Sequence, residues 1–210
     1  PGVVNIVTGD GSTGSLIVNH KDINKIAFTG STQVGKLIQK SLAGRDVGLT
    51  LELGGKAANI VYEDAAIDQA VEGVVNGIFF NQGHVCCAGS RLLLQESIHD
   101  QFVKKLEKRM QSLRVGNPLD KNTDIGAINS KEQLDKITSL VNEGVEDGGE
   151  LFQTQCELPG NGFWFRPSLF TNVQPSYSIA REEIFGPVLT TLTFRTPEEA
   201  VEIANNTEYG

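Results

Sequence analysis

The amino-acid sequence predicts an α/β fold in two parts. Three short apolar segments, 3–7, 25–29 and 49–53, are separated by stretches with helical character, and this alternation is typical of a parallel sheet. Two adjacent glycines, Gly54 and Gly55, interrupt the pattern. A second alternation of strands and helices then begins. The sequence therefore predicts a first domain over residues 1–54 and a second domain over residues 55–210.

The individual elements follow from periodicity and from capping residues. In the first part, a helix is expected through Leu16–Val18 and another over 32–42. In the second part, the predicted strands are 58–61, 91–95, 162–170, which is rich in aromatic residues, and 189–194. The predicted helices are 66–80, 97–114, 131–145 and 197–205, the last with Thr196 as its N-cap.

Composition excludes several classes of protein. The chain has 210 residues, of which 39% are hydrophobic, and a net charge of −8, so it predicts a globular protein without a nucleic-acid surface. Its apolar runs are shorter than the roughly 20 residues that a membrane helix needs. The three cysteines fit a reducing compartment, and we expect a cytoplasmic protein without a metal site.

Two of the cysteines, Cys86 and Cys87, lie in a polar break that contains glycine, between a predicted helix and a predicted strand. A thiol on such a connection is well placed to act as a nucleophile. Alternatively, a cysteine is only a small buried hydrophobic residue. In an extended segment adjacent side chains point in opposite directions, so we expect one thiol of the pair to face a substrate.

A carboxylate, Glu52, occupies the end of the strand predicted over 49–53, directly before the glycine pair. It is a candidate base, although a solvated charge at a strand end is the plainer interpretation. A second candidate site begins at Ser31, since the N-terminus of the helix over 32–42 can bind a pyrophosphate. Ser31 alone could equally be a simple N-cap.

A literal G-x-G-x-x-G pattern runs from Gly9 to Gly14. The dinucleotide fingerprint also requires an acidic residue about 20 positions later, at the end of the next strand. That strand instead runs into Thr29-Gly30-Ser31. We therefore reject the fingerprint and expect at most Gly11 to come near a cofactor.

Four stretches together closely resemble the aldehyde dehydrogenase superfamily, in its order and with its spacings. They are Phe-Thr-Gly-Ser-Thr-Gln-Val-Gly at 28–35, Leu-Glu-Leu-Gly-Gly-Lys at 51–56, Gln-Gly-His-Val-Cys at 82–86 and Glu-Glu-Ile-Phe-Gly-Pro at 182–187. The resemblance implies that residues 1–54 are the C-terminal half of a Rossmann-like domain binding NAD or NADP. Residues 55–210 are then a truncated catalytic domain, and the chain is an internal segment of a longer protein.

The resemblance also implies a reaction, the oxidation of an aldehyde to a carboxylic acid. Cys86 is expected to attack the carbonyl group, and the thiohemiacetal then loses hydride to the cofactor and becomes a thioester. Glu52 is expected to activate the water that hydrolyses the thioester. The presence of this base argues against relatives that transfer the acyl group to coenzyme A.

The resemblance assigns further residues to the cofactor. Glu183 would bind the nicotinamide ribose and Phe185 would pack beside the ring, whereas Gln133 and Lys136 would approach the ribose and adenine side or simply form a solvated helix face. The remaining expected contacts are Gly30, Ser31, Thr32, Gln33, Val34, Gly35 and Leu53. The chain departs from the family at Gln33, where Glu is common, and at His84, where Gln is usual.

Two other functions remain open. The chain could belong to a catalytically inactive homologue that keeps the fold for assembly, or to an esterase that uses the thiol without a cofactor. The resemblance further implies a homo-oligomer, and an oxyanion-hole asparagine and an adenosine-ribose lysine before Pro1. We therefore expect the 210-residue piece alone to have weak activity or none.

Overall fold

The computed structural model describes residues 2–209 of the protein. It divides the chain into two compact units, the first ending at Gly54 and the second beginning at Gly55. Pro1 and Gly210, the outer limits of the two predicted domains, lie outside the described residues. The cofactor-binding and catalytic roles of the two units remain predictions.

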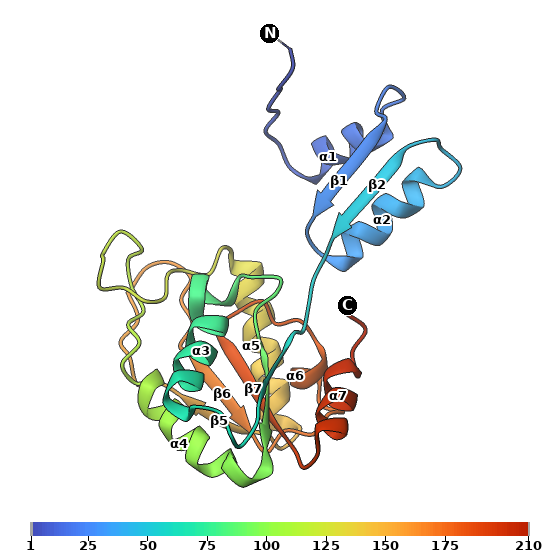
Figure 1. Ribbon diagram of the computed structural model, residues 1–210. Helices are drawn as coiled ribbons and strands as arrows, with labels where there is room; N and C mark the ends of the chain where they lie inside the picture. The colour runs from blue at the N-terminus through green and yellow to red at the C-terminus, as the bar shows by residue number, and fades with distance from the viewer. Residues whose placement is uncertain (1, 210) are drawn as a thin grey trace. The chain divides into compact units, whose positions relative to one another are not determined.

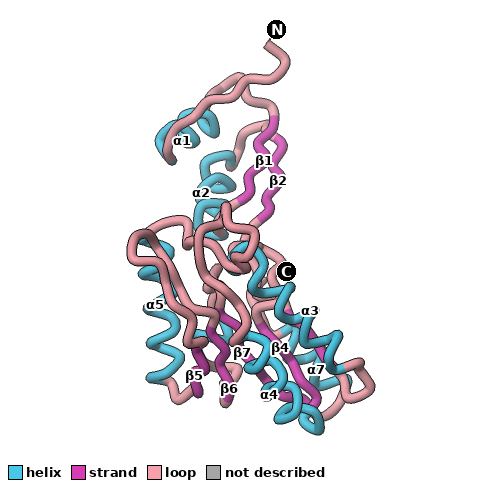
Figure 2. The backbone as a smooth tube through the Cα atoms, turned by 90° about the vertical axis from the view of Figure 1, so that its left-hand side faces the viewer, coloured by secondary structure: helices cyan, strands magenta, loops and turns pink. Residues whose placement is uncertain are grey.

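The first unit consists of two parallel strands and two helices. Strand β1 (Lys25–Thr29) pairs with β2 (Gly48–Glu52), and Thr29 lies opposite Glu52. Helices α1 (Gly11–Asn19) and α2 (Thr32–Leu42) pack on the same face of this pair (Figure 2). The core between the layers contains four buried residues, Val18, Ile26, Ile38 and Leu42. The helices predicted here and the strands over 25–29 and 49–53 are confirmed.

The strand predicted over residues 3–7 is wrong, because this segment is irregular in the structure. Val3 is 92% exposed and Ile6 is 88% exposed. A strand is stable only when a neighbouring strand satisfies its backbone and another layer covers its apolar face. Within the described first unit, β1 and β2 pair with each other and not with this segment.

The second unit is built on a five-stranded sheet with the order β3-β4-β7-β6-β5. The strands are β3 (Ala58–Val61), β4 (Arg91–Gln95), β5 (Glu150–Gln153), β6 (Ser168–Thr171) and β7 (Val188–Phe194). Four of them run parallel, and β5 is antiparallel to β6 at the edge. The sheet is thus mostly parallel, as the alternation in the sequence predicts.

Helices cover both faces of this sheet (Figure 1). The helices are α3 (Ile67–Phe79), α4 (His99–Met110), α5 (Lys131–Glu146), α6 (Ser178–Arg181) and α7 (Pro197–Asn205). Leu92 and Leu94 of β4 pack in the core beneath α3 and α4, and Leu93 packs against α7 on the opposite face. Because consecutive strand residues point to opposite faces, a strand buried on both sides is continuously apolar. No helix within residues 2–209 is long and apolar enough to span a lipid bilayer.

Two predicted elements of the second unit are longer than the observed ones. The strand expected over 162–170 begins only at Ser168, because Pro167 has no N–H to donate to a ladder. The helix expected over 97–114 is α4, which ends at Met110, where the Ser112 hydroxyl donates to the Arg109 carbonyl at 2.7 Å. Strand β5 and the single-turn helix α6 had no distinct signal in the sequence.

Candidate functional site

The candidate site of the second unit lies at the edge of the sheet where β3, β4 and β7 begin. Ala58, Arg91 and Thr190 are aligned across these parallel strands. The segments that enter the strands therefore meet at one edge. They are residues 55–57 before β3, residues 85–90 before β4, and residues 183–187 before β7.

The two adjacent cysteines occupy a turn, which we call the thiol turn (residues 85–88). Its hydrogen bond runs from the N–H of Ala88 to the carbonyl of Val85 at 3.1 Å. Cys86 and Cys87 are the central residues, and both thiols are free and exposed. A thiol in this position can meet a substrate from solvent.

The expectation that Cys86 and Cys87 lie in an extended segment is wrong. After α3 the chain passes through left-handed backbone at Asn81, Gln82 and Gly83, with φ of 49°, 48° and 76°. Such conformations reverse the chain, and a tight turn then leads it into β4. Strand alternation therefore cannot select one thiol, and the choice of Cys86 stays a prediction from the family motif.

The residues just before the thiol turn, Gly83 and His84, pack against the segment before β7. A Cβ atom on Gly83 would lie 2.1 Å from the carbonyl oxygen of Gly186, so only glycine allows this approach. The rings of His84 and Phe185 stack with centroids 5.2 Å apart and planes 12° apart. Phe185 itself has φ of 54°, a conformation that an aromatic residue rarely adopts. Packing thus fixes the position of Phe185 relative to the cysteines.

The carboxylate of Glu183 is held by backbone. Its Oε1 atom accepts a hydrogen bond from the N–H of Gly55 at 3.0 Å, and the Glu183 N–H donates to the Tyr209 hydroxyl at 3.4 Å. Gly55 also contacts the thiol turn, since a Cβ atom there would lie 2.4 Å from the carbonyl oxygen of Cys86. Gly55 therefore contacts both the Glu183 carboxylate and the backbone of Cys86.

Gln133 supports the same segment from α5. Its side-chain amide donates to the carbonyls of Ile184 and Phe185 at 2.8 and 3.1 Å. Ser130 caps α5 by accepting the Gln133 N–H at 3.1 Å. The structure thus gives Gln133 a role in holding the segment before β7, and the predicted contact with a cofactor remains a prediction.

His84 is a partly buried imidazole beside the thiol turn. Burial lowers the pKa of its imidazole below the ordinary value, because desolvation disfavours the charged form. Its Nε2 atom is buried and has no hydrogen-bond partner among residues 2–209. Across the same part of the chain, no group of three or more His, Cys, Asp or Glu side chains is arranged to hold a metal ion.

Sequence reasoning missed Lys56 and Arg91, two buried cations at this edge of the sheet. The ammonium group of Lys56 donates to the carbonyl of Ile179 at 3.0 Å. The Arg91 guanidinium donates to the carbonyls of Lys56, Ile203 and Ala204 at 2.7, 3.0 and 2.8 Å. Burial lowers the pKa of both groups, that of Lys56 to about 7. A lysine after two glycines normally indicates a solvated loop, so no local signal could reveal this burial.

The candidate site of the first unit lies at the opposite, carboxyl end of its strands. The N–H of Gly30 donates to the carbonyl of Glu52 at 3.0 Å, which joins the ends of β1 and β2. Ser31 is the N-cap of α2, with its hydroxyl accepting the Val34 N–H at 3.3 Å. Within α2, Gly35 allows Leu53 to pack closely, since a Cβ atom there would lie 2.6 Å from the Leu53 side chain.

A cavity of about 510 Å³ opens between α1 and α2 beside β1. Its lining is mostly apolar and includes Ile17, Ile26, Phe28, Val34 and Leu37, with Gly11 at its margin. A cleft of this size and character suits a flat aromatic group. The N-terminus of α2 adjoins it through Val34, so apolar surface and unpaired helix N–H groups occur together.

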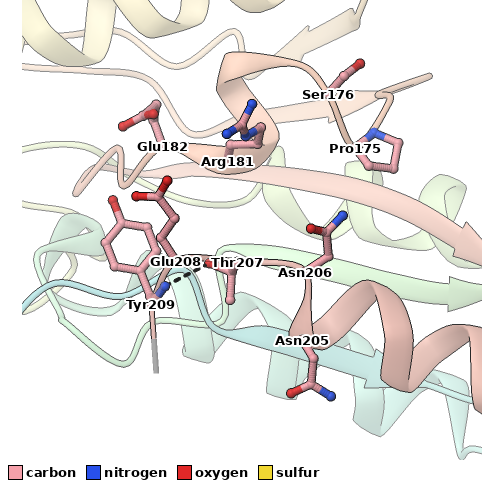
Figure 3. A pocket seen from close by; sticks show the side chains of 9 residues that line it. All are labelled: Pro175, Ser176, Arg181, Glu182, Asn205, Asn206, Thr207, Glu208 and Tyr209. Atoms are coloured by element: carbon pink, nitrogen blue, oxygen red, sulfur yellow. Dashed lines mark hydrogen bonds between the residues drawn. The ribbon is translucent and has the colours of Figure 1, made fainter.

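A further pocket of about 540 Å³ lies in the second unit and is predominantly polar. It is bordered by Arg181 at the end of α6, by Glu182, and by the residues from Asn206 to Tyr209 after α7 (Figure 3). Burial raises the pKa of Tyr209. The pocket thus borders the segment that carries Glu183, although none of the predicted catalytic residues lines it.

The family of the chain follows from comparison with known proteins. The model of the aldehyde dehydrogenase family matches residues 1–210. The chain belongs to the aldehyde dehydrogenase family. The resemblance in its four motifs is thereby confirmed.

Individual aldehyde dehydrogenases resemble this chain over its whole length. Retinal dehydrogenase 2 of Rattus norvegicus is 48% identical over 213 residues, which cover 100% of this chain and 41% of the relative. The same protein of Mus musculus matches equally, with 48% identity. The chain thus spans about 41% of the length of these curated relatives.

Solved structures of aldehyde dehydrogenases share the fold. The NAD-dependent enzyme of Sinorhizobium meliloti superposes with a TM-score of 0.93 at 42% identity, covering 97% of this chain and 41% of that one. The NAD+ complex of the Bacillus cereus enzyme gives a TM-score of 0.92 at 39% identity, covering 96% and 41%. The predicted aldehyde dehydrogenase-like α/β fold, with its Rossmann-like component, is confirmed.

In this aldehyde dehydrogenase chain the predicted site residues form two groups. The second unit brings Cys86, Gln133, Glu183 and Phe185 to one edge of its sheet. In the first unit, Leu53 packs against Gly35 of α2, and the Glu52 carbonyl accepts the N–H of Gly30, next to the N-cap Ser31. The meeting of Glu52 with Cys86 stays a prediction.

Proposed function

We propose that the intact protein oxidises an aldehyde to a carboxylic acid with NAD+ or NADP+, using Cys86 as nucleophile and Glu52 as general base. The observation that carries this proposal is the exposed Cys86 thiol, on a turn packed against the residue that binds the Glu183 carboxylate. Family membership supports the same reaction. Because the chain spans about 41% of its curated relatives, the proposal concerns the intact protein.

The residues of the chain fit a dinucleotide cofactor. The apolar cavity between α1 and α2 suits an adenine ring, and the N-terminus of α2 suits a pyrophosphate. A carboxylate such as Glu183 can accept hydrogen bonds from both hydroxyls of a ribose. The Sinorhizobium meliloti and Bacillus cereus relatives are an NAD-dependent enzyme and an NAD+ complex, which supports this cofactor class. When bound, the nicotinamide ring accepts a hydride ion.

The protein residues supply the remaining chemistry. The Cys86 thiolate forms a bond to the carbonyl carbon of the aldehyde, which gives a thiohemiacetal on the protein. Loss of hydride from that carbon leaves a thioester on Cys86. Glu52 removes a proton from a water molecule, the hydroxide adds to the thioester, and the C–S bond breaks. The acid is released and Cys86 returns as a thiolate.

A thiol-directed label tests the assignment of the nucleophile. The intact protein is treated with a limiting amount of iodoacetamide, with and without NAD+, and the modified peptides are identified by mass spectrometry. We expect Cys86 to react first and bound cofactor to change its rate, whereas Cys156, which is partly buried, reacts slowly. Labelling of Cys87 with Cys86 untouched would overturn the assignment.

Trapping of the acyl intermediate tests the base. In the Glu52→Gln variant hydrolysis lacks its general base, an effect on the order of 10²-fold to 10⁴-fold. An aldehyde plus cofactor should therefore leave the acyl group on the Cys86 peptide of this variant, as a mass increase absent from the wild type. If the variant instead turns over like the wild type, Glu52 is not the base.

A further inference from the structure

Lys56 carries an ammonium group that is almost completely enclosed by the protein. The residue is 2% exposed, and its Nζ atom donates to the carbonyl oxygen of Ile179 at 3.0 Å. Ile179 belongs to α6, which ends at Arg181. Glu183 follows two residues later. The Lys56 ammonium therefore holds the helix that leads directly to the Glu183 carboxylate.

The residue before Lys56 holds the carboxylate itself. The Gly55 N–H donates to Oε1 of Glu183 at 3.0 Å, and the Lys56 carbonyl accepts from Nε of Arg91 at 2.7 Å. The segment 179–183 is thus bound at both ends. The backbone N–H of Gly55 binds the side chain of Glu183, and the side chain of Lys56 binds the backbone carbonyl of Ile179. Arg91 thereby anchors Lys56 to the start of β4.

The electrostatic environment of Lys56 argues against a role in stability. Burial is the largest cause that lowers its pKa, followed by the positive charge of Arg91, and Lys136 acts in the same direction. Glu182 and Glu183 act in the opposite direction. A buried charge commonly contributes less to stability than an apolar residue of similar size. We therefore attribute the presence of this buried ammonium group to the function of the neighbouring site.

We propose that Lys56 is a positioning residue for the Glu183 carboxylate, which it aligns by tying α6 to the segment that binds that carboxylate. The inference rests on the proposed function, in which Glu183 binds a ribose of the cofactor. Without the Lys56–Ile179 hydrogen bond, α6 is free to shift. Glu183 then adopts orientations in which its carboxylate cannot accept hydrogen bonds from both ribose hydroxyls. The cofactor then binds more weakly, whereas the thiol and its chemistry are retained.

Replacement of Lys56 tests this role in the intact protein. Lys56→Met removes the charge and keeps the length, and Lys56→Gln keeps a donor for the Ile179 carbonyl. Lys108→Met, on the exposed surface of α4, is the matched control. Titration calorimetry with NAD+ and with NADP+ at about pH 6, where Lys56 with its pKa of about 7 is protonated, should give a Kd raised on the order of tenfold for the Met variant, the worth of one charge-assisted hydrogen bond. We expect a smaller increase for the Gln variant and none for Lys108→Met.

A double-mutant cycle with Glu183→Gln separates positioning from general damage. If Lys56 acts through Glu183, Lys56→Met weakens cofactor binding less in the Glu183→Gln background than in the wild type. In steady-state kinetics the KM for the cofactor should rise more than kcat falls. Equal factors in both backgrounds, or a fall in kcat alone, would overturn the proposal.

The outcomes also distinguish this inference from the proposed function. A wild-type protein that binds neither NAD+ nor NADP+ contradicts the proposed function. A wild-type protein that binds one of them, with Lys56→Met binding it equally well, contradicts only the inference. Thermal unfolding monitors the variants, and failure of both the Met and the Gln variant to fold would make Lys56 a determinant of the fold and overturn its role as a positioning residue.

Discussion

The two units present their candidate sites at opposite ends of parallel strands. In the first unit, Gly30, Ser31 and Glu52 lie where β1 and β2 end. In the second unit, the thiol turn and Glu183 lie before the strands begin. Ligands of open α/β sheets normally bind outside the carboxyl ends of the strands. The second unit therefore places its candidate site residues contrary to this rule.

The difference shows two ways of building a site. At a carboxyl end, a strand passes directly into a helix, and the helix N-terminus supplies backbone N–H groups and a positive dipole end. At the amino end of the second sheet, individual side chains hold the segments together, as Gln133, Glu183 and Lys56 do. We therefore expect substitutions to damage the second site more than the first.

The largest effect should come from Cys86 in the second unit. Cys86→Ala removes the nucleophile, so the rate of aldehyde oxidation should fall on the order of 10⁴-fold or more. Cys87→Ala is the matched control, because the two residues share one turn and both thiols are exposed. Steady-state rates of the intact protein measure both, and a larger loss for Cys87→Ala would reverse the roles of the two cysteines.

A glycine from each unit gives a direct comparison of how rigid the sites are. The Cβ atom of Gly55→Ala would lie 2.4 Å from a backbone oxygen, whereas that of Gly35→Ala would meet the end of the Leu53 side chain at 2.6 Å. Backbone cannot move aside as a side chain can, so Gly55→Ala should cost about 3 kcal/mol of unfolding free energy and much of the activity. Gly35→Ala should cost about 1 kcal/mol or less.

Gly73→Ala, in the interior of α3 where no atom lies within 4 Å of the added Cβ, is the control for both glycines. It should raise the unfolding free energy by up to about 1 kcal/mol, because alanine favours helix. Urea denaturation measures the unfolding free energy of all three variants. Equal losses for Gly55→Ala and Gly35→Ala would show that the two sites are equally tolerant.

The buried ammonium of the second unit should make stability depend on pH. In the unfolded chain Lys56 keeps its proton up to about pH 10.5, whereas in the folded protein it loses the proton above about pH 7. Between these values the unfolded state binds more protons, so the unfolding free energy rises with pH, by up to about 1.4 kcal/mol per pH unit. Below pH 7 both states are protonated and this contribution is constant.

The variant Lys56→Met lacks this contribution, so it isolates the effect from that of other groups. Urea denaturation at pH 7, 8 and 9 should give a wild-type stability that rises relative to that of Lys56→Met. Parallel pH dependences of the two proteins would show that Lys56 keeps an ordinary pKa in the folded state.

The smallest effect on function should come from the capping hydroxyl of the first unit. Ser31→Ala removes the acceptor for the Val34 N–H and should cost about 1 kcal/mol, as should Thr196→Ala at α7 of the second unit. Because backbone N–H groups bind the phosphate in our proposal, cofactor affinity should change by less than about threefold. A much larger loss for Ser31→Ala would mean that its hydroxyl itself binds the cofactor.

Local sequence signals predicted some elements to the residue. Helix α2 begins after Ser31 and α7 begins after Thr196, because each cap satisfies N–H groups of its own helix. The strand predicted over 3–7 is wrong, and the one predicted over 162–170 is observed only from Ser168 onward. A strand depends on a partner elsewhere in the chain, and propensity alone carries no information about that partner.

The candidate site was likewise only partly predictable from the local sequence. The motifs located Cys86, Glu52 and Glu183 in the sequence, but they did not show that the cysteines share a turn or that His84 stacks on Phe185. They also gave no indication that Lys56 is buried. The turn is local, but the stacking of His84 on Phe185 and the burial of Lys56 depend on segments far apart in the sequence that meet at one edge of the sheet.

The sequence by itself determined the family and the α/β class, because both are encoded in short runs of residues, and it predicted the candidate reactive side chains from its motifs. Only the tertiary structure decided how those side chains are held. Gly55 binds Glu183 and contacts the thiol turn, and the neighbouring ammonium of Lys56 fixes α6. Burial and hydrogen bonding between distant segments arise when the chain packs, and no local pattern records them.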